Sequence, residues 1–130
     1  MKIMVCYDGS KPSKKAFRLA KDHASAFDGS IIIVSSMTKG TDADKKDIEK
    51  VEQELRAMKK EFINEEYSCE THLLIRGLTA GEDLVQFAEE KKINEIIIGV
   101  KRRSRVGKLV FGSTAQFVIL RAHCPIVAVK

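Results

Sequence analysis

Several features are scarce in this chain, and each absence excludes a class of protein. No apolar run approaches the roughly 20 residues needed to cross a bilayer, so no transmembrane helix is expected. The amino-terminal segment reaches an acidic side chain, Asp8, too early for a secretory signal peptide. The cysteines are Cys6, Cys69 and Cys124, with no C-x-x-C pair, so neither a disulfide framework nor a zinc site is indicated. We therefore expect a cytoplasmic protein with no membrane partner.

Acidic residues are missing from the last part of the chain, where Glu95 is the final one. From Ile96 onward there are seven cations and no acid, so this part carries +7 and the remainder −2 of the net charge of +5. Because the positive charge is local, we expect a local anionic partner rather than a generally basic protein. Five of these cations lie in one loop: Lys101, Arg102, Arg103, Arg105 and Lys108.

The chain does contain a regular alternation of short apolar runs and longer amphipathic ones. The apolar runs predict buried strands, and apolar residues at helical spacing predict helices between them. Possible capping boxes open two of the helices, at Thr79 to Glu82 and at Ser113 to Gln116. Gly29 and Pro125 are expected to end the first and last helices. The expected strands span residues 2–7, 31–34, 69–75, 95–98 and 126–129, and the expected helices span 12–27, 48–62, 79–88 and 113–121.

This β-α-β-α-β-α-β-α-β pattern predicts an α/β fold in which residues 1–130 form one domain. Continuous apolar strands separated by amphipathic helices indicate a doubly wound, five-stranded parallel sheet with helices on both faces. Ligands of such sheets bind beyond the carboxyl ends of the strands, where the strand order reverses. Two segments compete for that place, Asp8-Gly9-Ser10 and the loop from Gly99 to Ser113. If the first and fourth strands are neighbours, both segments face one crevice.

The segment from Gly99 to Ser113 has the features of an anion site. An apolar run ends in Gly99, a cationic loop follows, and Gly112-Ser113 opens a helix. The N–H groups at the start of a helix are unsatisfied, and the helix dipole favours negative charge there. We interpret the segment as a site for a phosphate-bearing ligand. The histidines fall in different expected elements without a metal-ligand spacing, so no resident metal site is predicted.

An ordered set of short segments along the whole chain resembles the universal stress protein family. The matching segments are Val5–Ser10, Ile31–Val34, Arg76-Gly77, Ile96–Gly99, Gly112-Ser113 and Pro125–Val129. The resemblance implies the strand order 3-2-1-4-5 and a motif of nucleotide-binding members: Gly, two residues, Gly, nine residues, then Gly-Ser or Gly-Thr. The middle glycine is replaced by Arg102. Its guanidinium could substitute for backbone contact with phosphate, or it could fill the pocket.

The resemblance also implies roles for individual residues. Asp8 would accept hydrogen bonds from ribose hydroxyls or help to hold Mg²⁺ together with ATP. The backbone near Ser35 and Ser36 would meet the edge of adenine, and the start of the last helix would hold phosphates. Dimerisation through the last strand is implied as well. The implied nucleotide-binding residues are Asp8, Gly9, Ser10, Ser35, Gly99, Lys101, Arg102, Gly112, Ser113 and Thr114.

The function expected from these observations is a regulatory or stress-response protein that binds ATP or another adenine nucleotide. Little or no catalytic turnover is expected, because apart from Asp8 the crevice loops contain no carboxylate that could position an attacking group. An alternative, motivated by Arg102, is a family member that binds no nucleotide and acts on an unidentified protein partner. A nucleic-acid contact is less favoured, because only Phe111 accompanies the cations of the loop as a stacking surface.

Overall fold

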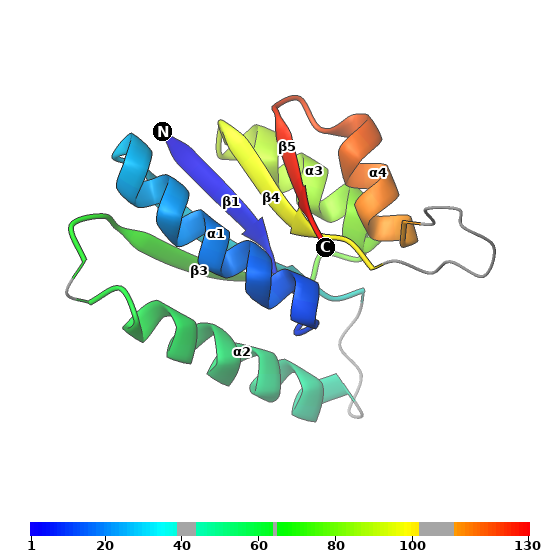
Figure 1. Ribbon diagram of the computed structural model, residues 1–130. Coiled ribbons are helices and arrows are strands. Elements are labelled where there is room, and N and C mark those ends of the chain that lie inside the picture. The colour runs from blue at the N-terminus through cyan, green and yellow to red at the C-terminus, as the bar shows by residue number, and fades with distance from the viewer. Residues whose placement is uncertain (39–43, 64, 102–110) are drawn as a thin grey trace.

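The computed structural model describes residues 1–38, 44–63, 65–101 and 111–130. Within these residues all strands are parallel and form one sheet, in the order β3-β2-β1-β4-β5 (Figure 1). The predicted doubly wound α/β fold and its strand order are therefore confirmed. The elements are β1 (Lys2–Cys6), α1 (Lys11–Phe27), β2 (Ser30–Ser36), α2 (Asp44–Lys60), β3 (Cys69–Leu74), α3 (Ala80–Glu90), β4 (Glu95–Gly99), α4 (Ser113–Arg121) and β5 (Ile126–Val129).

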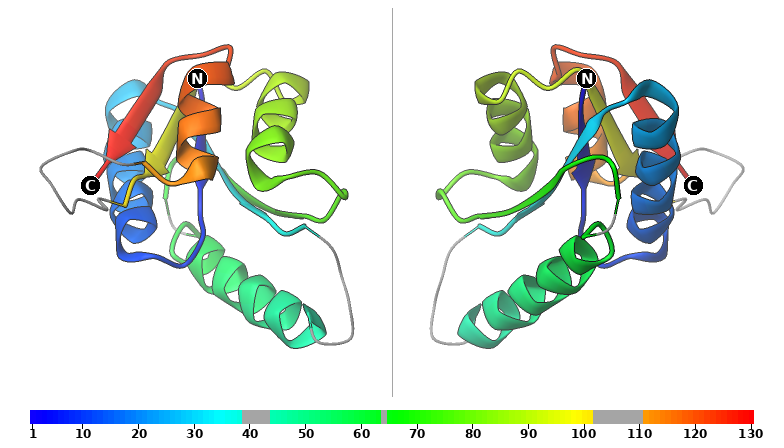
Figure 2. Two further views of the ribbon diagram at one scale, coloured as in Figure 1. Left: turned by 90° about the vertical axis from the view of Figure 1, so that its right-hand side faces the viewer. Right: turned by 90° about the vertical axis from the view of Figure 1, so that its left-hand side faces the viewer.

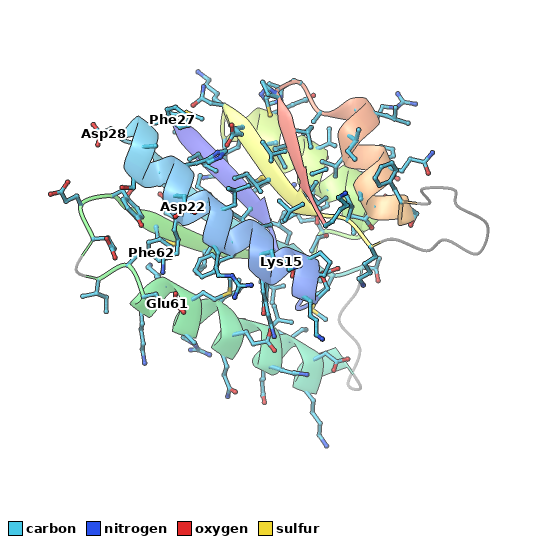
Figure 3. The ribbon with its side chains drawn as sticks, viewed as in Figure 1. Lys15, Asp22, Phe27, Asp28, Glu61 and Phe62 are labelled. Atoms are coloured by element: carbon cyan, nitrogen blue, oxygen red, sulfur yellow. The ribbon has the colours of Figure 1, made fainter. Side chains whose placement is uncertain are left out.

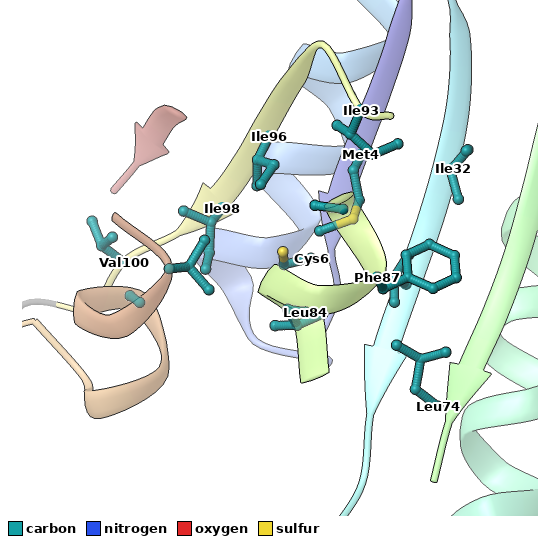
Figure 4. Packing of buried hydrophobic residues seen from close by; sticks show 14 residues of the cluster. Met4, Cys6, Ile32, Leu74, Leu84, Phe87, Ile93, Ile96, Ile98 and Val100 are labelled. Atoms are coloured by element: carbon teal, nitrogen blue, oxygen red, sulfur yellow. The ribbon is translucent and has the colours of Figure 1, made fainter. Parts of the chain in front are cut away.

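Helices cover both faces of the sheet, with α1 and α2 on one side and α3 and α4 on the other (Figures 1 and 2). Side chains alternate between these layers along each strand. In β2, Ile31 and Ile33 pack under α1 and α2, whereas Ile32 and Val34 pack against α3 and α4. The second of these cores is shown in Figure 4. Burial on both faces explains why the central strands read as unbroken apolar runs.

Side-chain contacts join α1 and α2 to each other and to the end of β1. Phe62 lies just beyond α2 (Figure 3). Its ring meets that of Phe17 on α1 edge to face, with ring centroids 5.5 Å apart. Tyr7, just beyond β1, donates its hydroxyl to a carboxylate oxygen of Glu54 on α2 at 3.1 Å. Burial, together with this hydrogen bond, raises the pKa of Tyr7 to about 12. These contacts fix helices α1 and α2 to the carboxyl end of β1, which is directly followed by Tyr7 and Asp8.

The helices begin and end close to the predicted residues, with differences in α1 and α2. Asp28, rather than Gly29, takes the left-handed conformation that ends α1, with φ of 51°. Helix α4 ends at Arg121, as predicted, and Pro125 lies between this end and β5. Helix α2 begins at Asp44, ahead of Ile48, the apolar residue at which the predicted helix began. In the part of the chain that the structure describes, no helix is both long and apolar enough to cross a membrane.

Candidate functional site

A cleft of about 320 Å³ opens at the carboxyl ends of β1 and β4, within the size range of small-molecule sites. The two strands are neighbours, with Cys6 in register with Ile98, so Asp8 and the described ends of the segment from Gly99 to Ser113 do converge. The first turns of α3 and α4 contribute the other walls. The lining residues are Cys6, Tyr7, Asp8, Ser13, Val34, Ser36, Ala80, Leu84, Ile98, Gly99, Lys101, Gly112, Ser113, Thr114 and Ala115.

The first turn of α4 forms one end of the cleft, and no side chain among the described residues caps it. The predicted capping box with Ser113 as the cap is wrong, because Gly112 is the N-cap and its carbonyl already accepts from the Gln116 N–H at 3.0 Å. Ser113, Thr114 and Ala115 line the cleft. By contrast, α1 is capped by the Ser10 hydroxyl and α3 by the Thr79 hydroxyl. The N–H groups at the start of α4 are therefore available to an anion.

Gly112 itself is not required by the protein's own packing. Its φ is −60°, which any residue adopts, and a Cβ added there would meet no atom of the described residues within 4 Å. The space beside it opens on the cleft that it lines. Glycine at this position leaves room for a ligand to come close to the backbone, which suits a phosphate cradle.

Gly99 has a different reason to be glycine. A Cβ there would lie 2.5 Å from the backbone carbon of Pro12 and the backbone nitrogen of Ser13. The end of β4 thus passes directly against the first turn of α1, and no side chain fits between them. The sequence motif attributes this glycine to a phosphate loop, and the structure gives it a packing role at the floor of the same cleft.

Asp8 and Lys101 lie next to each other on the cleft lining. A carboxylate oxygen of Asp8 lies 3.6 Å from Lys101 Nζ, and both side chains are more than half exposed. The other oxygen accepts from the backbone N–H of Ser10 at 2.9 Å. Burial on its own would raise the pKa of Asp8, but hydrogen bonds from Ser10 and Ser13 and the Lys101 charge outweigh it and lower the pKa. Asp8 is therefore an anionic acceptor beside a cation that can approach phosphate.

The opposite end of the cleft is mainly apolar. Val34 comes from β2, and Ala80 and Leu84 come from the first turns of α3. Cys6 lies beside them (Figure 4), and burial raises its pKa to about 12, so its sulfur remains a thiol. This surface suits a flat apolar ring. The cleft therefore runs from an anion-binding end to an apolar end.

One polar group at the apolar end, Ser36, belongs to a buried network. Its hydroxyl donates to Asp83 Oδ2 at 3.0 Å. Asp83 is fully buried, and its other carboxylate oxygen accepts from the Nε of Arg76. Arg76 Nη2 also donates to the backbone carbonyl of Asp83 at 3.2 Å, and Nη1 reaches Glu90 at 3.0 Å. The network joins the end of β2 to the turn before α3 and to α3 itself.

Some of the predicted site residues lie outside the cleft lining in the described part of the chain. Gly9 makes the turn after β1 with φ of 81°, and the hydroxyl of Ser10 caps α1. Ser35 is 5% exposed and donates to the Tyr7 carbonyl at 2.7 Å on the α1 side of the sheet. Arg102 falls outside the described residues. The predicted residues that do gather around the cleft are Asp8, Gly99, Lys101, Gly112, Ser113 and Thr114.

Sequence reasoning missed the contribution of α3, and it named the backbone near Ser35 and Ser36 but chose Ser35 as the binding residue. The cleft lies on the α3 and α4 side, where Ile32 and Val34 point, so alternation selects Ser36 rather than Ser35. The Thr79 capping box marked the start of α3 correctly, since its hydroxyl accepts from the Glu82 N–H. That the start of α3 lines the cleft depends on which face of the sheet α3 covers, which the capping box does not indicate.

Comparisons with known proteins agree with this architecture. The sequence profile of the Universal stress protein family matches residues 1–130. A universal stress protein of Methanocaldococcus jannaschii is 30% identical over 139 residues, covering 99% of this chain and 81% of that protein. The structure of a universal stress protein from Archaeoglobus fulgidus has a TM-score of 0.85 and 31% identity, covering 100% of this chain and 93% of that one. Another from that organism, solved in complex with dAMP, has a TM-score of 0.81 and 30% identity, covering 100% and 98%.

Proposed function

The chain belongs to the universal stress protein family, and we propose that its cleft binds an adenine nucleotide. The observation that carries the proposal is the uncapped start of α4, which opens on a cleft beside Lys101 and whose Gly112 leaves space next to the backbone. The related Archaeoglobus fulgidus protein in complex with dAMP supports an adenine nucleotide as the ligand.

The two ends of the cleft suggest how the nucleotide lies. The phosphates face the free N–H groups and the hydroxyls of Ser113 and Thr114, with Lys101 neutralising part of their charge. The base occupies the apolar end beside Val34 and Leu84. Asp8 lies between, where its carboxylate accepts from ribose hydroxyls.

ATP with Mg²⁺ is one form of ligand that this arrangement fits. Mg²⁺ is usually bound through one or two carboxylates together with phosphate oxygens. Asp8 is the single carboxylate on the cleft lining, and within the described residues no group of three or more His, Cys, Asp and Glu side chains could hold a metal ion alone. The ion would neutralise phosphate charge, and Asp8 would hold it only when the nucleotide is present.

Gly112→Ser tests the phosphate cradle, because the hydroxyl oxygen of a serine N-cap would accept from the N–H groups that the phosphate needs. We expect the free variant to gain a few tenths of a kcal/mol in stability while it loses affinity for the nucleotide. For the wild type, a nucleotide at 100 times its dissociation constant adds about 2.7 kcal/mol, which raises the melting temperature by several degrees. The measurement is thermal unfolding with and without Mg-ATP and AMP, with inorganic phosphate as a control.

Thr79→Ala is the matched control, since it removes a helix cap that is not on the cleft lining. It should lower stability by about 1 kcal/mol and keep the full nucleotide-dependent shift. Asp8→Ala should reduce that shift. No shift of the wild type with any nucleotide would contradict the proposal and favour a protein-interaction role independent of nucleotide.

The proposed role is regulatory or stress-responsive and cytoplasmic, with the nucleotide acting as a bound effector. Among the described residues, the cleft lining contains no carboxylate besides Asp8 to orient an attacking water. We therefore expect phosphate release from Mg-ATP to stay below about one turnover per second, the lower end for ordinary enzymes. Faster multiple turnover in a phosphate-release assay would refute the non-catalytic role.

A homodimer through β5 is the assembly that we propose. Strand β5 is an edge of the sheet, and its residues Ile126–Val129 are all apolar. An apolar edge strand invites pairing with another strand, and the nearby Leu120 of α4 is 71% exposed. Light scattering during size-exclusion chromatography should give twice the mass of one chain. The mass of a single chain at micromolar concentration would contradict the dimer.

A further inference from the structure

The hydrogen-bond network at the apolar end of the cleft fixes the direction in which the Ser36 hydroxyl donates its proton. Ser36 lines the cleft and donates its single proton to Asp83 Oδ2. Asp83 is fully buried against the Arg76 guanidinium, which donates and cannot accept. A carboxylate in this position has no proton to return to Ser36. The hydroxyl oxygen of Ser36 can therefore act toward the cleft only as an acceptor.

The position of this acceptor matters for the nucleotide. The anion-binding start of α4 and the apolar end lie on opposite sides of β1, because the strand order places β4 on one side and β2 on the other. When the phosphates of a bound nucleotide reach α4, its base lies beside Val34 and Leu84. The side chain of Ser36 places a hydroxyl at this end of the cleft. The Ser36 hydroxyl oxygen can accept a hydrogen bond from an N–H group of the base, and it repels a carbonyl oxygen of the base at the same place.

We propose that Ser36, held by Asp83 and Arg76, is a specificity-determining residue that selects a purine with an amino group at C6 over one with an oxo group. The inference rests on the proposed nucleotide site and adds the residues that discriminate between bases. Asp83 and Arg76 do not line the cleft in the described residues, so they act as positioning residues through Ser36.

Calorimetric titration of the full chain with AMP, IMP and purine riboside 5′-monophosphate, which has no group at C6, tests the proposal. We expect AMP to bind about tenfold more tightly than IMP or better, with the unsubstituted purine between them. In Ser36→Ala the AMP to IMP preference should fall to within about threefold, because neither partner remains to favour or oppose the C6 group.

Two further variants separate this role from a structural one. Ser35→Ala removes the neighbouring buried hydroxyl, which lies on the other side of the sheet, and should keep the AMP to IMP preference. Asp83→Asn should turn its amide oxygen toward Arg76 and its NH₂ toward Ser36, which frees the hydroxyl proton and shifts the preference toward IMP.

Nucleotide binding and base selection fail in different ways. A preference for AMP that survives Ser36→Ala, or a wild type that binds IMP at least as well as AMP, would overturn the proposal while leaving nucleotide binding intact. A wild type that binds none of the three nucleotides would overturn the proposed function itself.

Discussion

Gly99→Ala is expected to destabilise the protein by about 3 kcal/mol, although it adds a single methyl group. The added Cβ would lie 2.5 Å from backbone atoms of Pro12 and Ser13. Backbone atoms at the end of one strand and the start of one helix cannot move away as a side chain can, so α1 or β4 must shift. The measurement is the free energy of unfolding from urea titration, with the slope of the transition compared to confirm two-state behaviour.

Two other glycines provide comparisons for this result. At Gly81 the added Cβ would lie 2.8 Å from the Cβ of Phe117, which side-chain rotation does not move, so Gly81→Ala should also destabilise the protein by forcing α3 and α4 apart. At Gly112 it would meet no atom of the described residues within 4 Å, and Gly112→Ala should cost less than about 1 kcal/mol, because alanine is only a poorer N-cap than glycine. Equal effects at Gly99 and Gly112 would show that the contact with the start of α1 does not determine the requirement for glycine.

Arg76→Ala is the second change with a large expected effect, again about 3 kcal/mol. Asp83 is fully buried, and the substitution removes the guanidinium that faces its carboxylate while leaving the charge in place. The remaining hydrogen bond from Ser36 does not replace an opposite charge. Urea unfolding of the variant measures the loss.

Matched variants show whether the buried carboxylate is the cause. Glu90→Gln removes the other, exposed partner of Arg76 and should cost only a small part of the Arg76→Ala effect. The double variant Arg76→Ala with Asp83→Ala should recover part of the loss, because the unpaired charge is then gone. A double variant less stable than Arg76→Ala alone would contradict this explanation.

Two helix ends lie where they were predicted but are capped by a residue other than the predicted one, because the local sequence pattern and the local hydrogen bonding are different constraints. The sequence from Ser113 to Gln116 has the composition of a capping box, yet the Gly112 carbonyl closes the first helical ring, and Ser113 is inside the helix. Similarly, Asp28 takes the left-handed conformation although glycine follows it. In both cases the sequence allows either of two adjacent residues to be the cap, and the backbone conformation determines which of them is.

The sequence by itself determined the fold class, because apolar runs buried on both faces and amphipathic runs between them fit only a covered parallel sheet. It also pointed to Asp8 and to the glycine-bounded segment that ends at Gly112 and Ser113, since strand ends and helix starts carry recognisable residues. Only the tertiary structure decided that Ser36 rather than Ser35 reaches the cleft, and that Asp83 and Arg76 stand behind it. These contacts join segments far apart in the chain, and their partners depend on which face each helix covers, a property that no local pattern encodes.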